Sequence, residues 1–405
     1  MPVGEAWRGA LLAERFDALD TLLARQWQWW RPRAFQQLRL PWETEHAGLA
    51  GALRALSADR IAELAAQDSA LVEFLGPFIP EIKILAELCA VPASPRHAAP
   101  LSLAEPYGVP GRKWRQTLEF LRCLPDSGLP VLEWCAGKAH LGRALAAQQG
   151  RSVEALEWNA TLVEDGNRLA RREHLPVTVH CVDVLQNEAA AWIGHAQEVV
   201  ALHACGDLHR QLLMQCARRT PRALALVPCC YHLGAAECHV PLSRAAMGRL
   251  TLTRDDLRTA VQETVTAPAR DRAQRQKLQA WRLGFDLLQR ELRGVDEYLP
   301  TPSLALSVLR EGFESFCRKL AAQQDIALPA NMDFDVFEQR GAQRAHEVAA
   351  LDLVRVSFRR PLELWLVLDR ALYLQEHGYD VEVGTFCERP LTPRNLLIRA
   401  RRFYA

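Results

Sequence analysis

This 405-residue sequence lacks long hydrophobic runs and contains little lysine. The longest apolar stretches, such as Ala223 to Pro228, fall far short of the roughly 18 to 20 residues of a membrane span, so no membrane contact is expected. The amino terminus lacks the pattern of an export signal, and repeats and low-complexity segments are missing. With 49% hydrophobic and 24% charged residues, the composition is typical of a folded globular protein. At roughly 150 residues per domain, the length allows two or three domains.

All but five of the 49 basic residues are arginine, although the net charge is only +1. This skew has two interpretations: a GC-rich genome, or phosphate recognition, to which the planar guanidinium fork is suited. The eleven cysteines are an odd number, and several lie inside apolar runs. A framework of paired disulfides would look different, so we expect a reduced, cytoplasmic protein.

The spacing of apolar residues along the chain predicts four consecutive segments. Residues 1–100 and 236–345 repeat apolar side chains at helical spacing, and the second of these segments is rich in basic residues. Residues 101–235 alternate short apolar runs with helical stretches, which predicts a parallel sheet with right-handed crossovers. Residues 346–405 resume sheet character and complete that domain, and a proline-rich linker is expected over Val91–Pro110. The predicted fold class is therefore α/β, a Rossmann-like doubly wound sheet with a helical amino-terminal domain and a helical insertion after the fifth strand.

The apolar runs give the expected positions of the strands and helices. Five strands are predicted first, at Pro130–Cys135, Val153–Glu157, Val177–Val182, Glu198–His203 and Ala223–Cys229. The helices between and after them are predicted at 138–149, 160–173, 186–193 and 207–219. A last helix and two last strands are predicted at Leu364–Tyr373, Asp380–Phe386 and Asn395–Ala400.

The sharpest motif joins the first strand to the first helix and runs from Glu133 to Leu141 as Glu-Trp-Cys-Ala-Gly-Lys-Ala-His-Leu. Small residues there let a ligand approach backbone N–H groups at the start of a helix. The Gly-x-Gly-x-x-Gly fingerprint of dinucleotide sites is missing, which disfavours a nicotinamide dehydrogenase, and an acid on the strand would repel a pyrophosphate. S-adenosylmethionine, with an ammonium group, a sulfonium and no phosphate, suits such an acidic site.

Acids also mark the ends of the next two strands. Glu157 ends the second strand, where a carboxylate can accept hydrogen bonds from ribose hydroxyls. Asp183, followed by Val184, ends the third, where a carboxylate could hold an adenine amino group. Three acids at successive strand ends near the switch point of one sheet predict a binding site for such a cofactor.

Two further motifs resemble a known family when they are combined with the Glu133–Leu141 loop. These are Leu-His-Ala-Cys-Gly-Asp-Leu at 202–208 and Pro-Cys-Cys-Tyr-His at 228–232. The chain resembles the class I methyltransferase-like domain of the methyltransferase-like 25 group and the glutathione S-transferase C-terminal-domain-containing protein, and more distantly tRNA 2′-O-methyltransferases with a Cys-Cys-His-His motif. Gly-Arg-Lys-Trp at 111–114 and Leu-Thr-Pro-Arg-Asn at 391–395 resemble that family's basic motif and closing segment.

The resemblance covers roughly residues 105–235 and 350–405, and Cys135 stands where the family usually has its first glycine. Together with the strand ends, it implies S-adenosylmethionine as cofactor, held by Lys113, Glu133, Cys135, Gly137, Lys138, Leu141, Glu157, Asp183, Val184, His203 and Cys205. The expected substrate contacts are Cys230, Tyr231, Arg394 and Asn395. Asp207 is the first candidate for a catalytic base and His232 the second, while a helix N-cap is the alternative role of Asp207.

The cysteines and histidines near these strands raise the question of zinc. Paired ligands at the usual spacing are incomplete, and adjacent residues of a strand, such as Cys229 and Cys230, point to opposite faces. We therefore expect no metal. The leading hypothesis is an S-adenosylmethionine-dependent methyltransferase with RNA, and tRNA in particular, as substrate. A protein or small-molecule acceptor, or a non-catalytic protein that keeps the fold, remains an alternative.

Overall fold

The computed structural model describes residues 6–97, 109–262, 269–302 and 304–403. Contacts divide the chain into two compact units, the first made of residues up to 24, 85–262 and 360 onward, and the second of 25–84 and 263–359. The boundary expected at residues 100 and 101, and most of the expected proline-rich linker, lie outside the described residues. None of the helices in the described ranges combines the length and the apolar character needed to cross a membrane.

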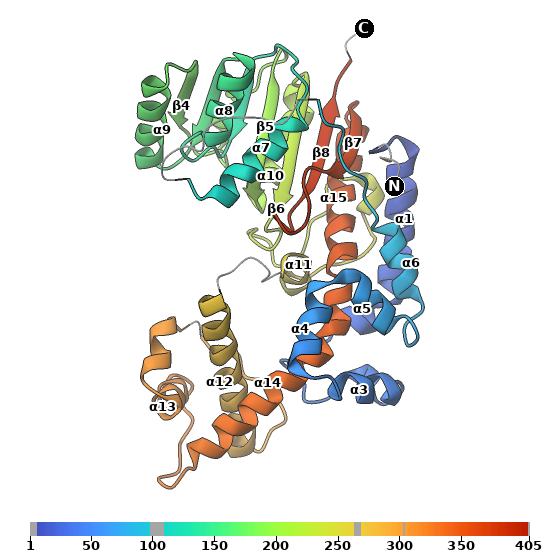
Figure 1. Cartoon of the computed structure of the whole chain (residues 1–405), viewed down its shortest axis with the longest axis vertical. Helices are drawn as coiled ribbons and strands as arrows, with labels where there is room; N and C mark the ends of the chain where they lie inside the picture. The colour runs from blue at the N-terminus through green and yellow to red at the C-terminus, as the bar shows by residue number, and fades with distance from the viewer. Residues whose placement is uncertain (1–5, 98–108, 263–268, 303, 404–405) are drawn as a thin grey trace. The chain divides into compact units, whose positions relative to one another are not determined.

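The first unit is built on one eight-stranded sheet, which Figure 1 shows, with the order β1-β7-β8-β6-β5-β2-β3-β4. The strands are β1 (Trp7–Arg8), β2 (Val131–Trp134), β3 (Val153–Glu157), β4 (Val177–Cys181), β5 (Glu198–Cys205), β6 (Ala223–Cys229), β7 (Asp380–Thr385) and β8 (Leu396–Arg401). Strands β2 to β6 pair in parallel, whereas β8 is antiparallel to both β6 and β7. The predicted α/β sheet is confirmed, with strand ends shifted by at most two residues, and only the short β1 was not predicted.

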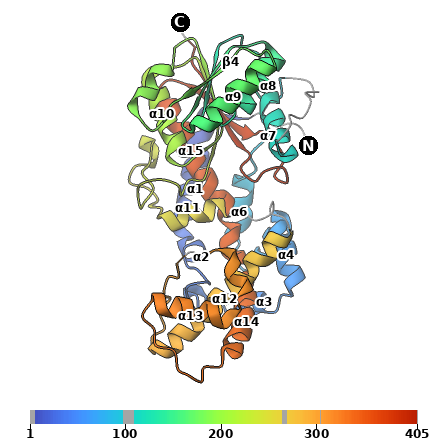
Figure 2. The same cartoon turned by 90° about the vertical axis from the view of Figure 1, so that its left-hand side faces the viewer.

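The parallel strands form because they are short apolar runs that can be buried on both faces. All seven residues of β6 and all four of β2 are buried. Helices α8 (His140–Gln149) and α9 (Ala160–Arg172) follow β2 and β3, and they lie side by side in both views (Figures 1 and 2). Because the chain runs in the opposite direction from β5 to β6, right-handed crossovers place α10 (Asp207–Arg219) on the other face.

The remaining helices of the first unit frame this sheet. They are α1 (Ala10–Arg25), α6 (Glu81–Leu88), α7 (Gly111–Arg122), α11 (Arg254–Val261) and α15 (Arg359–Glu376), with short 3₁₀ turns η2 (Asn187–Trp192) and η3 (Arg244–Ala246). The helix predicted at 186–193 is thus a 3₁₀ turn, because the segment is short and its N-cap, Gln186, makes no side-chain capping bond.

The second unit is helical. Its elements are α2 (Trp27–Trp30), η1 (Pro41–Glu43), α3 (Ala47–Arg54), α4 (Ala58–Ala66), α5 (Asp68–Leu75), α12 (Ala269–Arg293), η4 (Leu306–Arg310), α13 (Phe313–Gln323) and α14 (Phe334–Ser357). Helices α12 and α14 cross closely, since a Cβ on Gly341 would lie only 2.7 Å from the Cα of Gly284. Aromatic side chains, among them Trp281 and Phe316, fill the core beside this crossing.

Candidate active site

The sheet order places a switch point between β2 and β5. From β2 the chain moves outward to β3 and β4, and from β5 it moves in the opposite direction to β6. Ligands of doubly wound sheets bind in the crevice at the carboxyl ends of the strands on either side of such a point. Most of the predicted cofactor residues lie at the carboxyl ends of β2 to β5 or in the loops that follow them, whereas Lys113 lies in α7 and Leu141 in α8.

Glu133 lies on β2 and is almost fully buried. Its Oε2 accepts a hydrogen bond of 2.8 Å from the backbone N–H of Gly142 in the first turn of α8. Burial raises the pKa of Glu133 to about 8. A Cβ at position 142 would come within 2.6 Å of the same oxygen, so glycine is needed for this approach. Glu133 therefore ties the strand to the helix, and its contact with the cofactor ammonium stays a prediction.

Glu157, at the end of β3, holds the loop between β2 and α8. Its Oε2 accepts the N–H of Gly137 at 2.9 Å, and its Oε1 accepts the N–H of Asn159 at 3.0 Å. Three residues of the loop have left-handed backbone angles, Cys135 (φ 58°), Gly137 (φ 59°) and Ala139 (φ 51°). The carboxylate thus fixes a tightly folded loop while keeping lone pairs that ribose hydroxyls can use.

The other predicted cofactor residues lie around this loop. Asp183, directly after β4, is exposed, and its carboxylate accepts bonds from the Leu185 N–H at 3.0 Å and the Gln186 side chain at 3.1 Å. Val184 and Leu141 are buried beside the loop. Lys138 forms an ion pair of 2.7 Å with Asp165 of α9. The exposed carboxylate of Asp183 is therefore well placed to meet a ligand.

The two outlying family motifs meet at Leu391. Arg112 and Gln116 of α7 donate hydrogen bonds to the Leu391 carbonyl at 2.6 and 3.0 Å. The amide oxygen of Gln116 lies 2.8 Å from Nε2 of His203. His203 is thereby held in place by α7, and burial lowers its pKa to about 4, so its ring is neutral at pH 7. Gln116 was not predicted as a site residue, because a glutamine in an amphipathic helix carries no distinctive pattern.

Backbone strain gathers at the same edge of the sheet. Cys135 and Cys230 directly follow β2 and β6, with φ angles of 58° and 49°, and His203 lies inside β5 near its carboxyl end, with φ 66°. A bulge between Leu202 and Ala204 interrupts the pairing of β5 with β6. Such backbone angles cost of order 1–3 kcal/mol each, and they persist mainly where a binding or catalytic site needs them.

Three cysteines meet at the ends of β5 and β6. Cys205 and Cys229 are direct partners in the strand pairing, with their Sγ atoms 3.4 Å apart. Cys230 joins them, so that all three Sγ atoms lie within 4.8 Å of one another. Hydrogen bonds from Cys205 and Cys229 hold the pKa of Cys230 well below its usual value. The expectation that Cys229 and Cys230 point to opposite faces is wrong, because the left-handed backbone of Cys230 turns its side chain back.

The candidate bases lie on the loops that follow β5 and β6. Asp207 is the first residue of α10, whose N-cap is Gly206, and its Oδ2 accepts the N–H of Ala235 at 2.8 Å. The carboxylate therefore anchors the loop after β6. The Nδ1 atom of His232 is buried and has no hydrogen-bond partner among the described residues. Tyr231 points inward, where its hydroxyl donates to the Pro228 carbonyl at 3.3 Å.

Arg394 and Asn395, the remaining predicted substrate contacts, both bond to the protein itself. Arg394 donates to the carbonyl of Val261 at the end of α11. The Asn395 side chain is buried, and its amide donates to the Cys387 carbonyl at 2.7 Å while Arg360 donates to its oxygen at 3.1 Å. These bonds hold the closing segment against the sheet, and a contact with substrate stays a prediction.

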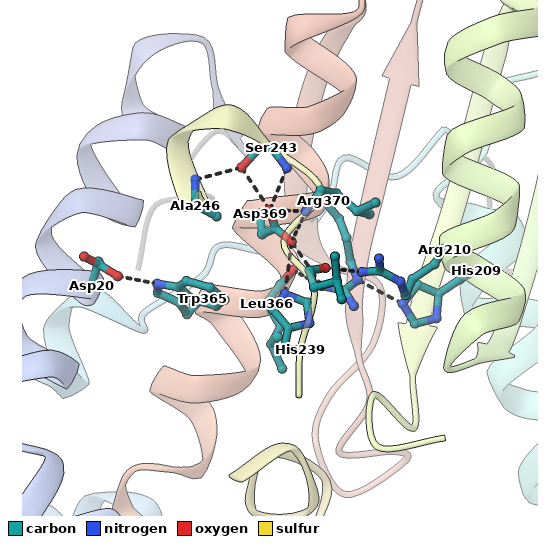
Figure 3. Close-up of polar contacts among 12 residues, drawn as sticks. Asp20, His209, Arg210, His239, Ser243, Ala246, Trp365, Leu366, Asp369 and Arg370 are labelled. Carbon is teal, nitrogen blue, oxygen red and sulfur yellow. Dashed lines mark hydrogen bonds and ion pairs between the residues drawn. The ribbon is translucent and has the colours of Figure 1, made fainter. Parts of the chain in front are cut away.

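A buried polar network on α15 supports the strand ends (Figure 3). Arg370 is 1% exposed; it donates to Nε2 of His209 at 2.9 Å, and its guanidinium lies 4.9 Å from the ring centre of Tyr231. His209 connects Arg370 to the sheet, because its Nδ1 lies 2.9 Å from the Ala204 carbonyl of β5. The neighbouring Asp369 accepts the N–H and hydroxyl of Ser243 at 2.8 and 2.9 Å. The network was not predicted, because nothing in an apolar helical stretch marks an arginine as buried.

A cavity of about 710 Å³ adjoins the loop after β2. Its cationic lining residues come from α7, the loop, α8 and α9, and they are Lys113, Lys138, Arg143, Arg168 and Arg172. Glu173 pairs with Arg143, and Asp165 pairs with Lys138 and Arg168, which leaves an excess of positive charge. Burial, followed by the charges of Arg143, Lys113 and Lys138, lowers the pKa of the lining His140 to about 4. The cavity is therefore suited to an anion.

Residues 115–237 match the sequence profile of a family described as a methyltransferase domain. Similar solved structures include geranyl diphosphate C-methyltransferase from Streptomyces coelicolor, solved with S-adenosyl-L-homocysteine, at 16% identity and a TM-score of 0.25, with 37% of this chain and 64% of that one covered. Another is coclaurine N-methyltransferase bound to N-methylheliamine and SAH, at 17% identity and a TM-score of 0.26, with 45% and 62% covered. A third, from work on disulfide-to-thioacetal conversion in echinomycin biosynthesis, has 20% identity, a TM-score of 0.21, and 24% and 45% covered.

The chain thus spans less than two thirds of the length of each of these three proteins. The family match covers the part of the doubly wound sheet whose strand ends carry the loop and the acids described above. The resemblance expected from the sequence is confirmed at the level of the class I methyltransferase fold. Residues 115–237, which match a methyltransferase-domain family, contain all five parallel strands of this Rossmann-like sheet, β2 to β6.

Proposed function

We propose that this protein is an S-adenosylmethionine-dependent methyltransferase that acts on RNA, with tRNA as the first candidate. The cofactor site would be formed by the loop from Cys135 to Lys138, by Glu157 on the ribose and by Asp183 on the adenine. All eleven cysteines, which lie within the described residues, are free thiols, as a cytoplasmic location requires.

The observation that carries the choice of RNA is the cationic cavity. Gly137 and Lys138 belong both to its lining and to the cofactor loop, so an anion bound there would lie next to the methyl donor. Among the described residues, neither Lys113 nor Arg172 takes part in an ion pair. Free cationic groups on rigid helices are suited to backbone phosphates, which position a nucleic acid without reading its sequence.

When bound, S-adenosylmethionine supplies an electrophilic methyl group. The chain's own contribution is to hold the acceptor in line with that group, since positioning accounts for much of the acceleration of such a displacement. His203, held by Gln116 and neutral at pH 7, lies near the carboxyl end of β5 beside the crevice. Asp207 and His232 stay the predicted groups for taking a proton from a hydroxyl or amine acceptor.

The test measures transfer of radiolabelled methyl groups to total RNA, together with RNA binding at several salt concentrations. Each lost phosphate contact should reduce the steepness of log K against log salt by about 0.7 for single-stranded RNA, so Arg172→Ala, which removes a cation of α9 that has no ion pair among the described residues, should reduce it by about 0.7. Arg171→Ala is the matched control, because Arg171 is an exposed arginine of the same helix that does not line the cavity. Two results would refute the choice of RNA. One is label that appears in protein or small molecules but not in RNA, and the other is RNA binding that does not depend on the salt concentration.

A further inference from the structure

We propose that Cys205, Cys229 and Cys230 bind a zinc ion, with His232 as the fourth ligand. Within the described part of the chain, these cysteines are the only group of three potential ligands whose donor atoms lie within 4.8 Å of one another. The site goes beyond methyl transfer, and the proposal does not depend on the proposed function.

The sulfur positions suit a tetrahedral ion. Zinc–sulfur bonds of about 2.3 Å in tetrahedral geometry place two sulfurs about 3.8 Å apart. The observed separation between Cys205 and Cys229 is 3.4 Å, and no pair in the group exceeds 4.8 Å. Only small side-chain adjustments are therefore needed to reach the bonded arrangement.

The backbone brings these thiols together in a conformation that apolar packing does not require. Direct pairing in the sheet places Cys205 and Cys229 on the same face. The next residue of an extended strand would point away, but Cys230 has φ 49° and turns its sulfur back toward the other two. A left-handed non-glycine residue is strained, and a bound ion would supply the energy that offsets the strain.

The fourth donor, His232, interacts electrostatically with Cys230 but lies outside the group whose atoms are within 4.8 Å of one another, so its ring must move toward the sulfurs to bind the ion. The Nδ1 atom of His232, two residues beyond Cys230, is buried without a hydrogen-bond partner among the described residues. Buried polar atoms are rarely left unpaired, and a neutral imidazole nitrogen is a common zinc ligand. Three thiolates and one imidazole form one of the usual sets of structural zinc sites. Softer thiolate ligands also exclude Mg²⁺ and Ca²⁺, which prefer oxygen.

Such an ion would clamp the ends of β5 and β6, the strands whose loops carry Asp207 and Tyr231. It would therefore hold the edge of the sheet where the acceptor is expected to bind. His232 would act as a ligand and not as a base, which leaves Asp207 as the predicted proton acceptor.

The experiment is elemental analysis of the untagged full-length protein, purified without chelators, together with the absorption spectrum after replacement of zinc by Co²⁺. We expect about one zinc per chain and a cobalt–thiolate charge-transfer band. Cys205→Ser and Cys230→Ser should lower the bound zinc at least about tenfold. Cys181→Ser is the matched control, because Cys181 ends β4 at the edge of the same sheet, lies outside the group and should leave the zinc content unchanged.

Circular dichroism of each variant separates loss of the metal from loss of the fold. The cobalt spectrum of the unmodified protein tests the site even if the variants do not fold. Two results would overturn the proposal. One is unmodified protein without zinc and without a cobalt–thiolate band. The other is zinc that stays bound in folded Cys205→Ser and Cys230→Ser proteins.

Discussion

The substitution Arg370→Met tests the buried network on α15. The guanidinium donates hydrogen bonds of 2.9 Å to His209 and 2.7 Å to the Leu366 carbonyl, and it stacks on Tyr231 with almost no exposure to water. Methionine has a similar length and is apolar, so it fills most of the space but donates nothing. Asp369, whose carboxylate is 3.7 Å away, loses its nearest full positive charge.

Two contributions set the size of the effect. The Nε2 atom of His209 loses its donor, and an acceptor left unpaired in the interior costs about 1–3 kcal/mol, whereas the Leu366 carbonyl keeps the backbone N–H of residue 370 within α15. Removing one member of a buried charged group typically costs about 3–5 kcal/mol in total, because the remaining partners stay desolvated. We therefore expect the free energy of unfolding of the first unit to fall by roughly 3–5 kcal/mol. For a unit of this size, that corresponds to a Tm lower by roughly 6–20 °C.

The assay is thermal unfolding followed by near-UV circular dichroism, with Arg370→Lys as the control that keeps the charge but loses the fork. The Tm of Arg370→Lys should lie between that of Arg370→Met and that of the unmodified protein. A Tm of Arg370→Met within about 2 °C of the unmodified protein would contradict this expectation, since losing the buried guanidinium would then cost less than about 1 kcal/mol.

Three further changes follow from the site. Glu157→Gln should weaken S-adenosylhomocysteine binding at least about tenfold in calorimetry, because an amide offers one acceptor oxygen where the carboxylate uses two. Glu154→Gln, on the same strand, is the control. Equal losses of affinity in both variants would contradict the role of Glu157 in holding the cofactor. Since burial raises the pKa of Glu133 to about 8, the folded state binds a proton that the unfolded state releases above pH 4.5, so stability falls as pH rises from 4.5 to 8. Glu133→Gln should thus gain stability over the unmodified protein across that range in denaturant titrations, and parallel pH curves would speak against it. Gly206→Ala should prevent soluble expression, because its Cβ would lie 1.8 Å from the Leu233 carbonyl at a φ of 54°, and a stable variant would mean that the loop can move.

The strands and the loop after the first of them could be predicted, because local sequence carries their signals. Strands such as Val153–Glu157 and Ala223–Cys229 are apolar runs bounded by polar residues, and their observed bounds coincide with the predicted ones. The acids at strand ends followed from the same pattern, since parallel strands all end at one edge of the sheet.

The arrangement around the site could not be predicted, because it depends on contacts between distant segments. Gln116 reaches His203 across 87 positions, and Arg370 reaches His209 across 161. The left-handed turn at Cys230 has no signal in a cysteine, which rarely adopts that conformation. Likewise, no local pattern shows that residues 25–84 pack with 263–359, because amphipathic helices do not encode which partner they meet.

Calorimetric titration with S-adenosylmethionine and S-adenosylhomocysteine, using Asp183→Ala for comparison, tests the central claim most directly. We predict micromolar binding of both ligands by the unmodified protein and a loss of at least about tenfold in the variant, which lacks the exposed carboxylate after β4. No binding of either ligand at millimolar concentration would contradict a working cofactor site on this sheet.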